Sequence, residues 1–164
     1  IILVYIVMAS QFESFVSPFV IMFSIPFAFV GVIMGLFVTG TPLGVMGMIG
    51  ILILMGIVVK NGIVLIDYTI LMRERGKSVA EASVIAAKSR LRPILMTTLT
   101  TVLGMIPMAI GQGEGAEMWR SLGMVVAWGL TISTLVTLVI IPTVYASMSS
   151  WQERRAARKA ARNA

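Results

Sequence analysis

Cysteine and histidine are both missing from the 164-residue sequence. Without cysteine the chain has no disulfide and no thiol chemistry, and without either residue it lacks the usual zinc and haem ligands. Charged residues are also scarce: they form 12% of the chain, about half the share in an average soluble domain. We therefore expect neither a metal nor a cofactor, and the composition argues against a soluble protein.

The chain is instead dominated by apolar residues, at 58% of the sequence with a mean hydropathy of +0.98. This composition predicts an all-α, polytopic transmembrane helix bundle. Four apolar runs are long enough to cross a bilayer, and a fifth is the end of a span; they lie at 15–38, 44–72, 93–113, 118–148 and 1–9 respectively. The bundle thus occupies 1–150, followed by a basic tail at 151–164.

The first residues show how the chain starts. It opens on Ile1 within an apolar run and has neither an initiator methionine nor a basic leader region. A secretory signal peptide would carry a positively charged segment before its apolar stretch. We therefore expect a piece of a longer protein, without a signal peptide.

The net charge of +6 is distributed in a way that predicts topology. Of 13 basic residues, six lie within 73–92 and five between Arg154 and Arg162. Basic clusters that flank membrane spans belong on the cytoplasmic side. We therefore place 73–92 and 149–164 in the cytoplasm, and the loops at 39–43 and 111–118 on the outer side.

The tail is too basic to enter a membrane. Anionic lipid head groups attract a basic residue near the surface by about 1 kcal/mol. RNA is the other partner that such a tail suits. Because the tail follows a membrane span directly, we expect anionic lipids as its partner and no nucleic acid.

Between the second and third full spans, the sequence predicts a short surface helix. Ser78-Val-Ala-Glu81 has the spacing of a capping box, which begins a helix. Val79, Ala82 and Ala86 share one side, so this helix, at 79–89, is expected along the cytoplasmic membrane surface. Pro93 is expected to end it, with an elbow near Arg92.

Prolines and glycines within the spans predict kinks and close packing. Pro26 and Pro107 lie inside apolar runs, where each removes a helical hydrogen bond. Gly31 and Gly35 form a GxxxG pair, and Gly123 with Ala127 forms a similar small-residue pair. Such residues allow close helix packing, and they also permit hinge or sliding motion.

A lysine lies in the middle of the second full span. Residues 14–59 carry no charge, and Lys60 then falls about 24 Å and about 18 Å from the two ends of a helix over 44–72. A charge at that depth costs at least about 2.5 kcal/mol and requires a partner. Asp67 is the only acid on that helix, about 10 Å along its axis, which is too far for an ion pair. The partner is therefore expected from a segment outside the chain.

Threonines crowd one third of the next span, at positions 97, 98, 100 and 101. Thr97, Thr101 and Gly104 share one side of the helix. Threonines in membrane helices commonly bond back to their own backbone. Four in so short a segment also suit a polar or hydrated seam, and both interpretations stay open here.

Several motifs together resemble a known family. They are Gln11-Phe-Glu-Ser14, Gly56-Ile-Val-Val-Lys60-Asn61, Arg90-Leu-Arg-Pro-Ile-Leu-Met-Thr97 and Gly104-Met-Ile-Pro107. In order and spacing they resemble the second half of the membrane domain of the resistance-nodulation-division (RND) transporters, in the hydrophobic/amphiphilic multidrug branch. The match covers nearly the whole chain, from the end of the eighth helix through the twelfth.

The resemblance implies a proton-driven antiporter of the bacterial inner membrane, which is not an enzyme and uses the proton motive force instead of a cofactor. Such transporters work as trimers. They pass drugs, detergents or other amphiphiles through a periplasmic domain to a periplasmic adaptor and an outer-membrane channel. Under this resemblance the outer loops 39–43 and 111–118 are periplasmic.

The resemblance also implies roles for particular residues. Lys60 takes the position of a lysine that pairs with two aspartates on the fourth helix, Thr97 is the relay hydroxyl, and Arg90 is a basic group towards the cytoplasmic end. Asn61, next to Lys60 in the motif, is assigned to the same proton relay. The aspartates, the first six helices and the substrate-holding domains are absent, so we expect no transport by this chain alone.

Three alternatives remain. An RND relative that exports lipid or protein would share these motifs. A passive bundle that only scaffolds a trimer would have no use for the charge of Lys60. An intramembrane enzyme would have to rely on a serine nucleophile, since neither histidine nor cysteine is present.

Overall fold

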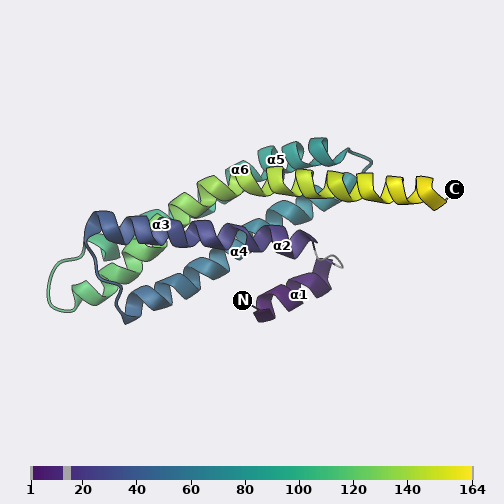
Figure 1. The fold of residues 1–164 in the computed structure, drawn as a ribbon. Coiled ribbons are helices and arrows are strands. Elements are labelled where there is room, and N and C mark those ends of the chain that lie inside the picture. The colour runs from purple at the N-terminus through teal and green to yellow at the C-terminus, as the bar shows by residue number, and fades with distance from the viewer. Residues whose placement is uncertain (1, 13–15, 164) are drawn as a thin grey trace.

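Helices make up all the regular structure in the described part of the chain (Figure 1). The computed structural model describes the backbone of residues 2–12 and 16–163 and the side chains of 2–12 and 17–151. The helices in this part are α1 (Ile2–Phe12), α2 (Val16–Met22), α3 (Ser24–Thr39), α4 (Val45–Glu74), α5 (Val79–Ile110) and α6 (Ala116–Asn163). The predicted all-α class is confirmed.

The four predicted spans are also confirmed. Four helical segments in the described chain are apolar and long enough to cross a membrane: Ser17–Thr39, Val45–Glu74, Val79–Ile110 and Ala116–Trp151. α1 is a shorter apolar helix, and it continues to Phe12 through the start of the polar break predicted at 10–14. The rest of that break lies outside the described residues.

The first full span is interrupted near Pro26, as predicted. The break falls at Phe23, between α2 and α3, because Pro26 has no N–H to donate to the carbonyl of Met22 one turn earlier. The hydroxyl of Ser24 donates to the carbonyl oxygen of Ile21 at 2.6 Å. A side chain thus satisfies one of the backbone acceptors at the break.

The separate surface helix expected over 79–89 is instead the first part of α5. The capping box is present, with the Glu81 N–H donating to the Ser78 hydroxyl at 3.3 Å, but the helix runs on through Pro93 to Ile110. Ending a helix leaves up to four carbonyls and four N–H groups without partners, whereas a proline inside it removes one donor. Continuity is therefore favoured in an apolar setting.

The side of α5 that was expected to lie on the membrane surface packs inside the protein. Val79, Ala82 and Ala86 are all buried, with Ala82 and Ala86 at 0% exposure. Val79 and Ala86 belong to a cluster that includes Ile66 of α4 and Ile141 of α6. The small residues of this segment therefore serve helix packing.

α6 lies at the centre of the bundle and packs along α3, α4 and α5 (Figure 1). A Cβ added to Gly31 would lie 3.0 Å from the Ile132 side chain and 3.1 Å from the Gly129 backbone. One added to Gly123 would lie 2.8 Å from the backbone nitrogen of Ala109. Gly31 and Gly123, one from each predicted small-residue pair, therefore mark places where two helices approach closely.

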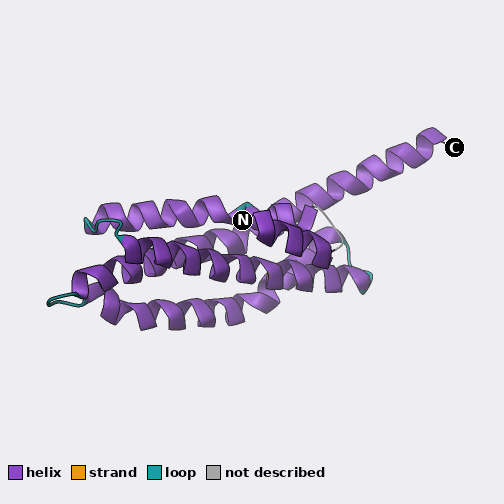
Figure 2. Cartoon of the chain, turned by 90° about the horizontal axis from the view of Figure 1, so that it is seen from below, coloured by secondary structure: helices purple, strands orange, loops and turns teal. Residues whose placement is uncertain are grey.

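The loops divide between two ends of the bundle. Residues 40–44 and 111–115 lie at one end, and the 75–78 turn lies at the other (Figure 1). The 48 residues of α6 extend about 72 Å, well beyond a ~30 Å hydrocarbon layer, and the C-terminal end of the chain projects past the bundle (Figure 2). The predicted tail at 151–164 is largely the end of α6, and its side chains from 152 onward lie outside the described residues.

Candidate functional site

Lys60 lies at the middle of α4. It is about 22 Å from Val45 and about 21 Å from Glu74 along the helix axis. Its side chain is on an exposed side of the bundle, whereas the neighbouring Asn61 is buried at 8% exposure. The Lys60 side chain is therefore exposed at mid-depth, whereas the Asn61 amide lies inside the bundle. The structure does not bring these two predicted site residues together.

The ammonium group of Lys60 has no counter-charge in the described part of the chain. No described residue forms an ion pair with it or accepts a hydrogen bond from it. Asp67 is exposed on nearly the same side of α4, seven residues on, at an axial distance of about 10 Å. Within the described residues, the bundle thus exposes a cation that a membrane environment does not tolerate unpaired.

Arg90 is half-buried on α5, where it contacts an aromatic residue of α4. Its guanidinium carbon lies 4.8 Å from the centroid of the Tyr68 ring, within the range of a cation–π contact. Arg90 and Thr97 are seven residues apart and so share one side of α5. The structure therefore connects the second predicted basic group to the helix that carries Lys60.

This contact also aligns the two helices in depth. α4 and α5 run in opposite directions, joined by the turn at 75–78 (Figure 1). Eight residues separate Tyr68 from Lys60 on α4, and counting eight residues on from Arg90 along α5 reaches Thr98. Counting from the turn instead places Lys60 opposite about residue 93, so at ~1.5 Å per residue Lys60 lies within about 6 Å of Thr97 in depth.

The four threonines of α5 divide into two kinds. The hydroxyls of Thr97, Thr100 and Thr101 donate to the carbonyl oxygens four residues earlier, at 2.9, 2.8 and 2.9 Å respectively. Thr98 is instead buried, and its hydroxyl oxygen lies 3.1 Å from the hydroxyl oxygen of Thr134 on α6. Three of the four threonines thus donate a hydrogen bond to their own helix backbone, and Thr98 contacts another helix.

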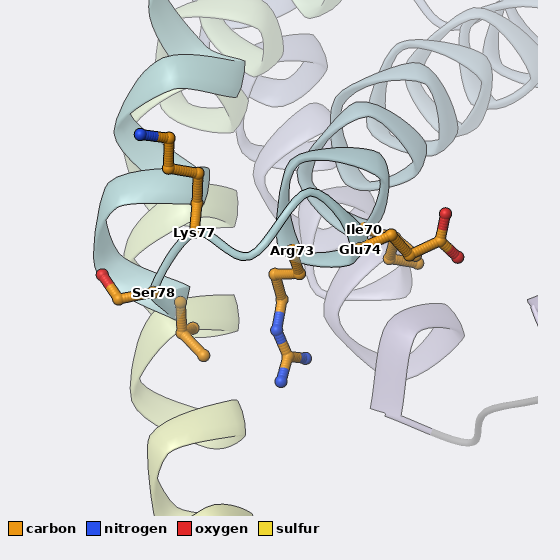
Figure 3. A pocket seen from close by; sticks show the side chains of 6 residues that line it. Ile70, Arg73, Glu74, Lys77 and Ser78 are labelled. Carbon is orange, nitrogen blue, oxygen red and sulfur yellow. The ribbon is translucent and has the colours of Figure 1, made fainter.

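A pocket of about 430 Å³ lies at the turn between α4 and α5 (Figure 3). It is lined by Ile70, Arg73, Glu74, Lys77, Ser78 and Val79. The charged ends of Arg73, Glu74 and Lys77 point in three different directions. Because these charges do not converge, we assign no ligand to this pocket.

The model of the AcrB/AcrD/AcrF family matches residues 1–149. The chain belongs to this family. It is thus a fragment of the transmembrane domain of an RND transporter, and the resemblance drawn from the Lys60 and Arg90 motifs is confirmed.

Relatives within the family are named for different roles. The chain is 42% identical over 154 residues to the swarming motility protein SwrC of Bacillus subtilis, a match that covers 93% of this chain and 15% of SwrC. It is 41% identical over 152 residues to the multidrug resistance protein MdtC of Erwinia tasmaniensis, covering 92% of this chain and 15% of MdtC.

A solved member of similar architecture is a heavy metal efflux pump. Its crystal structure matches with a TM-score of 0.80 at 33% identity, over 89% of this chain and 15% of the pump chain. The chain therefore spans about a seventh of the length of these family members.

Two residues at the site were missed from the sequence. Tyr68 and Thr134 lie within apolar runs, and neither belongs to a motif that distinguishes it from ordinary packing residues. Their roles depend on contacts with α5, since Tyr68 meets Arg90 and Thr134 meets Thr98. Tyr68 and Thr134 can therefore be identified only from the positions of Arg90 and Thr98 in the folded structure.

Proposed function

We propose that this chain supplies the lysine, threonine and arginine side of an intramembrane proton relay, in an antiporter that exports drugs or other amphiphiles. The observation that carries the proposal is Lys60: a cation at mid-depth, on an exposed side of α4, with no counter-charge among the described residues. In a transporter that binds and releases protons on carboxylates, such a cation would pair with the carboxylates while they are ionised. The acids would come from the first half of the same membrane domain, on a helix with aspartates.

The relay would work through the loss of one electrostatic attraction. At an effective dielectric constant of about 20, unit charges about 4 Å apart attract by about 4 kcal/mol, enough to shift a two-state equilibrium by about three orders of magnitude. Protonation of the absent carboxylates would remove this attraction and free Lys60 to turn towards Thr97 on the neighbouring helix α5. The helices would then tilt between two packed arrangements.

Arg90 and Asn61 would support the relay in different ways. Arg90 lies towards the end of the bundle that carries the basic turn, where protons would exchange with the cytoplasm. Asn61 is buried next to Lys60 in the sequence and would keep that part of α4 packed when the lysine moves. This assignment gives Asn61 a supporting role rather than direct contact with the proton.

The proposed setting is the bacterial inner membrane. Segments 73–92 and 149–164 would be cytoplasmic, with the basic tail on anionic lipids, while 39–43 and 111–118 would be periplasmic. The two pairs of segments lie at opposite ends of the bundle, which supports this orientation. The whole transporter would be a homotrimer, reaching a periplasmic adaptor and an outer-membrane channel through domains outside this chain.

The substrate class rests on the multidrug relatives. Other relatives are named for swarming motility and heavy metal efflux, so drug export is not the role of every relative. The second candidate is an RND transporter that exports a lipid or protein. Drug susceptibility and lipid export should be compared in cells that lack the full-length transporter. Increased drug susceptibility with normal lipid export supports the drug exporter, and the opposite pattern supports the alternative.

The relay is tested by Lys60→Met in the full-length protein. We expect a folded trimer in which drug efflux and drug-linked proton flux fall to the level of cells without the transporter, because the carboxylates lose their counter-charge. Lys88→Met, at an exposed lysine of α5, is the matched control and should retain activity. Normal efflux by the Lys60 variant, or by Lys60→Leu, would favour the passive scaffold instead.

A further inference from the structure

The contact between Tyr68 and Arg90 joins α4 to α5 through a ring and a cation. The guanidinium carbon lies 4.8 Å from the ring centroid, and both side chains are half-buried. The negative face of an aromatic ring attracts a cation most strongly when water is excluded. The contact therefore favours orientations of Arg90 in which the guanidinium lies over the ring.

The described residues hold Arg90 in no other specific way. Its Nε is buried and has no hydrogen-bond partner, and no described carboxylate pairs with the guanidinium. A buried guanidinium would ordinarily be placed by a carboxylate, which forms paired hydrogen bonds with it. Here the Tyr68 ring is the contact that determines where the group lies.

An aromatic ring and a carboxylate hold an arginine with different consequences. A carboxylate occupies N–H donors and cancels the charge, whereas a ring is uncharged and contacts the flat face of the guanidinium. The N–H groups at the edge stay available for other acceptors. An arginine held in this way keeps both its charge and its donors while its position is defined.

We propose that Tyr68 is a positioning residue that holds Arg90 through the face of its ring, so that the guanidinium acts in proton transfer with its charge and its N–H donors uncommitted. The inference rests on the proposed relay, since it assumes that Arg90 takes part in proton movement. The same contact joins α4 to α5, the two helices that carry Lys60 and Thr97.

The test is a series of fluorinated phenylalanines at position 68 of the full-length transporter. Fluorine withdraws electron density from the ring face with little change in volume, so each added fluorine weakens the attraction for the cation while packing is nearly kept. We expect Tyr68→Phe and Tyr68→Trp to retain proton-coupled efflux. Efflux should then fall stepwise with each fluorine, reaching about a three- to thirtyfold loss in Tyr68→Leu.

A matched series at Phe29 is the control. Phe29 of α3 is a half-buried ring packed against the apolar cluster that includes Ile66 of α4 and Ile141 of α6, and no cation lies over it among the described residues. Fluorination there changes packing but not a cation contact. Efflux should therefore not depend on the number of fluorines at Phe29.

The outcomes separate this inference from the relay itself. If Lys60→Met and Arg90→Leu abolish proton-coupled efflux while the series at 68 is flat, Tyr68 does not position Arg90 and the relay stands. If Arg90→Leu transports normally, the role of Arg90 in the relay is wrong, and the inference falls with it. A graded loss at 68 together with a flat series at Phe29 supports the inference.

Discussion

α5 and α6 are both long apolar helices, yet they relate to the bundle in opposite ways. In the most apolar 18-residue stretch of each helix, 56% of the α6 residues are buried within the bundle, against 17% of the α5 residues. α6 is surrounded by α3, α4 and α5, whereas much of α5 is bare. Two members of the candidate site, Thr97 of α5 and Lys60 of α4, are exposed in the described bundle.

This difference shows which exposed surface needs a partner. Lipid tails are as apolar as leucine, so exposed leucines of α5 are compatible with the membrane as they stand. An exposed ammonium at mid-depth is not, because every estimate of its cost requires compensation. The exposed apolar surface of α5 can therefore face lipid without a partner. Lys60, by contrast, requires a polar segment from outside this chain.

The largest effect on stability is expected from truncating a leucine at the centre of α6. Leu130 is 0% exposed and packs in a cluster with Leu54 and Val58 of α4. Leu130→Ala should lower the free energy of unfolding by about 2–4 kcal/mol, because the cavity forfeits packing contacts even without water. Leu103→Ala, at 61% exposure on α5, should change it by less than about 0.5 kcal/mol. Equal losses, measured by unfolding in detergent micelles, would contradict the comparison.

A smaller difference is expected between two glycines. At Gly123 of α6 an added Cβ would lie 2.8 Å from the backbone of Ala109, while one added to Gly104 of α5 would meet no described atom of another helix within 4 Å. Gly123→Ala should destabilise the bundle by about 1–3 kcal/mol, because the backbone of α5 must shift. Gly104→Ala should be neutral or slightly stabilising, since alanine favours helix. Thermal stability of the purified protein distinguishes the two, and a destabilised Gly104 variant would show that α5 is covered there.

The smallest effect concerns the threonines. Thr98 contacts Thr134 at 3.1 Å, whereas Thr100 bonds only to its own helix. Thr98→Val should cost about 0.6 kcal/mol, the average for an interhelical hydrogen bond in a membrane protein. Thr100→Val should cost nearly nothing. A double-mutant cycle with Thr134→Val measures the coupling, and a coupling of zero would mean that the two hydroxyls do not interact.

Much of the framework could be predicted from local features. Long apolar runs identify the four spans, the Ser78–Glu81 spacing identifies the start of α5, and Pro26 identifies the interrupted span. Each of these depends on the chemistry of neighbouring residues along the chain. The continuity of α5 through Pro93 was not predicted, because the preference of a residue before proline is outweighed by the backbone groups that a helix end would expose.

The site divides in the same way. The depth of Lys60 follows from counting residues along one helix, so the sequence alone determined that a charge lies in the middle of a span and lacks an acid nearby. The tertiary structure decided that Lys60 faces outward and Asn61 inward, that Arg90 rests on Tyr68, and that Thr98 meets Thr134. The reason is that these helices are apolar on nearly every side. Periodicity cannot tell which side will pack when lipid and protein are equally apolar, and only the contacts between helices settle it.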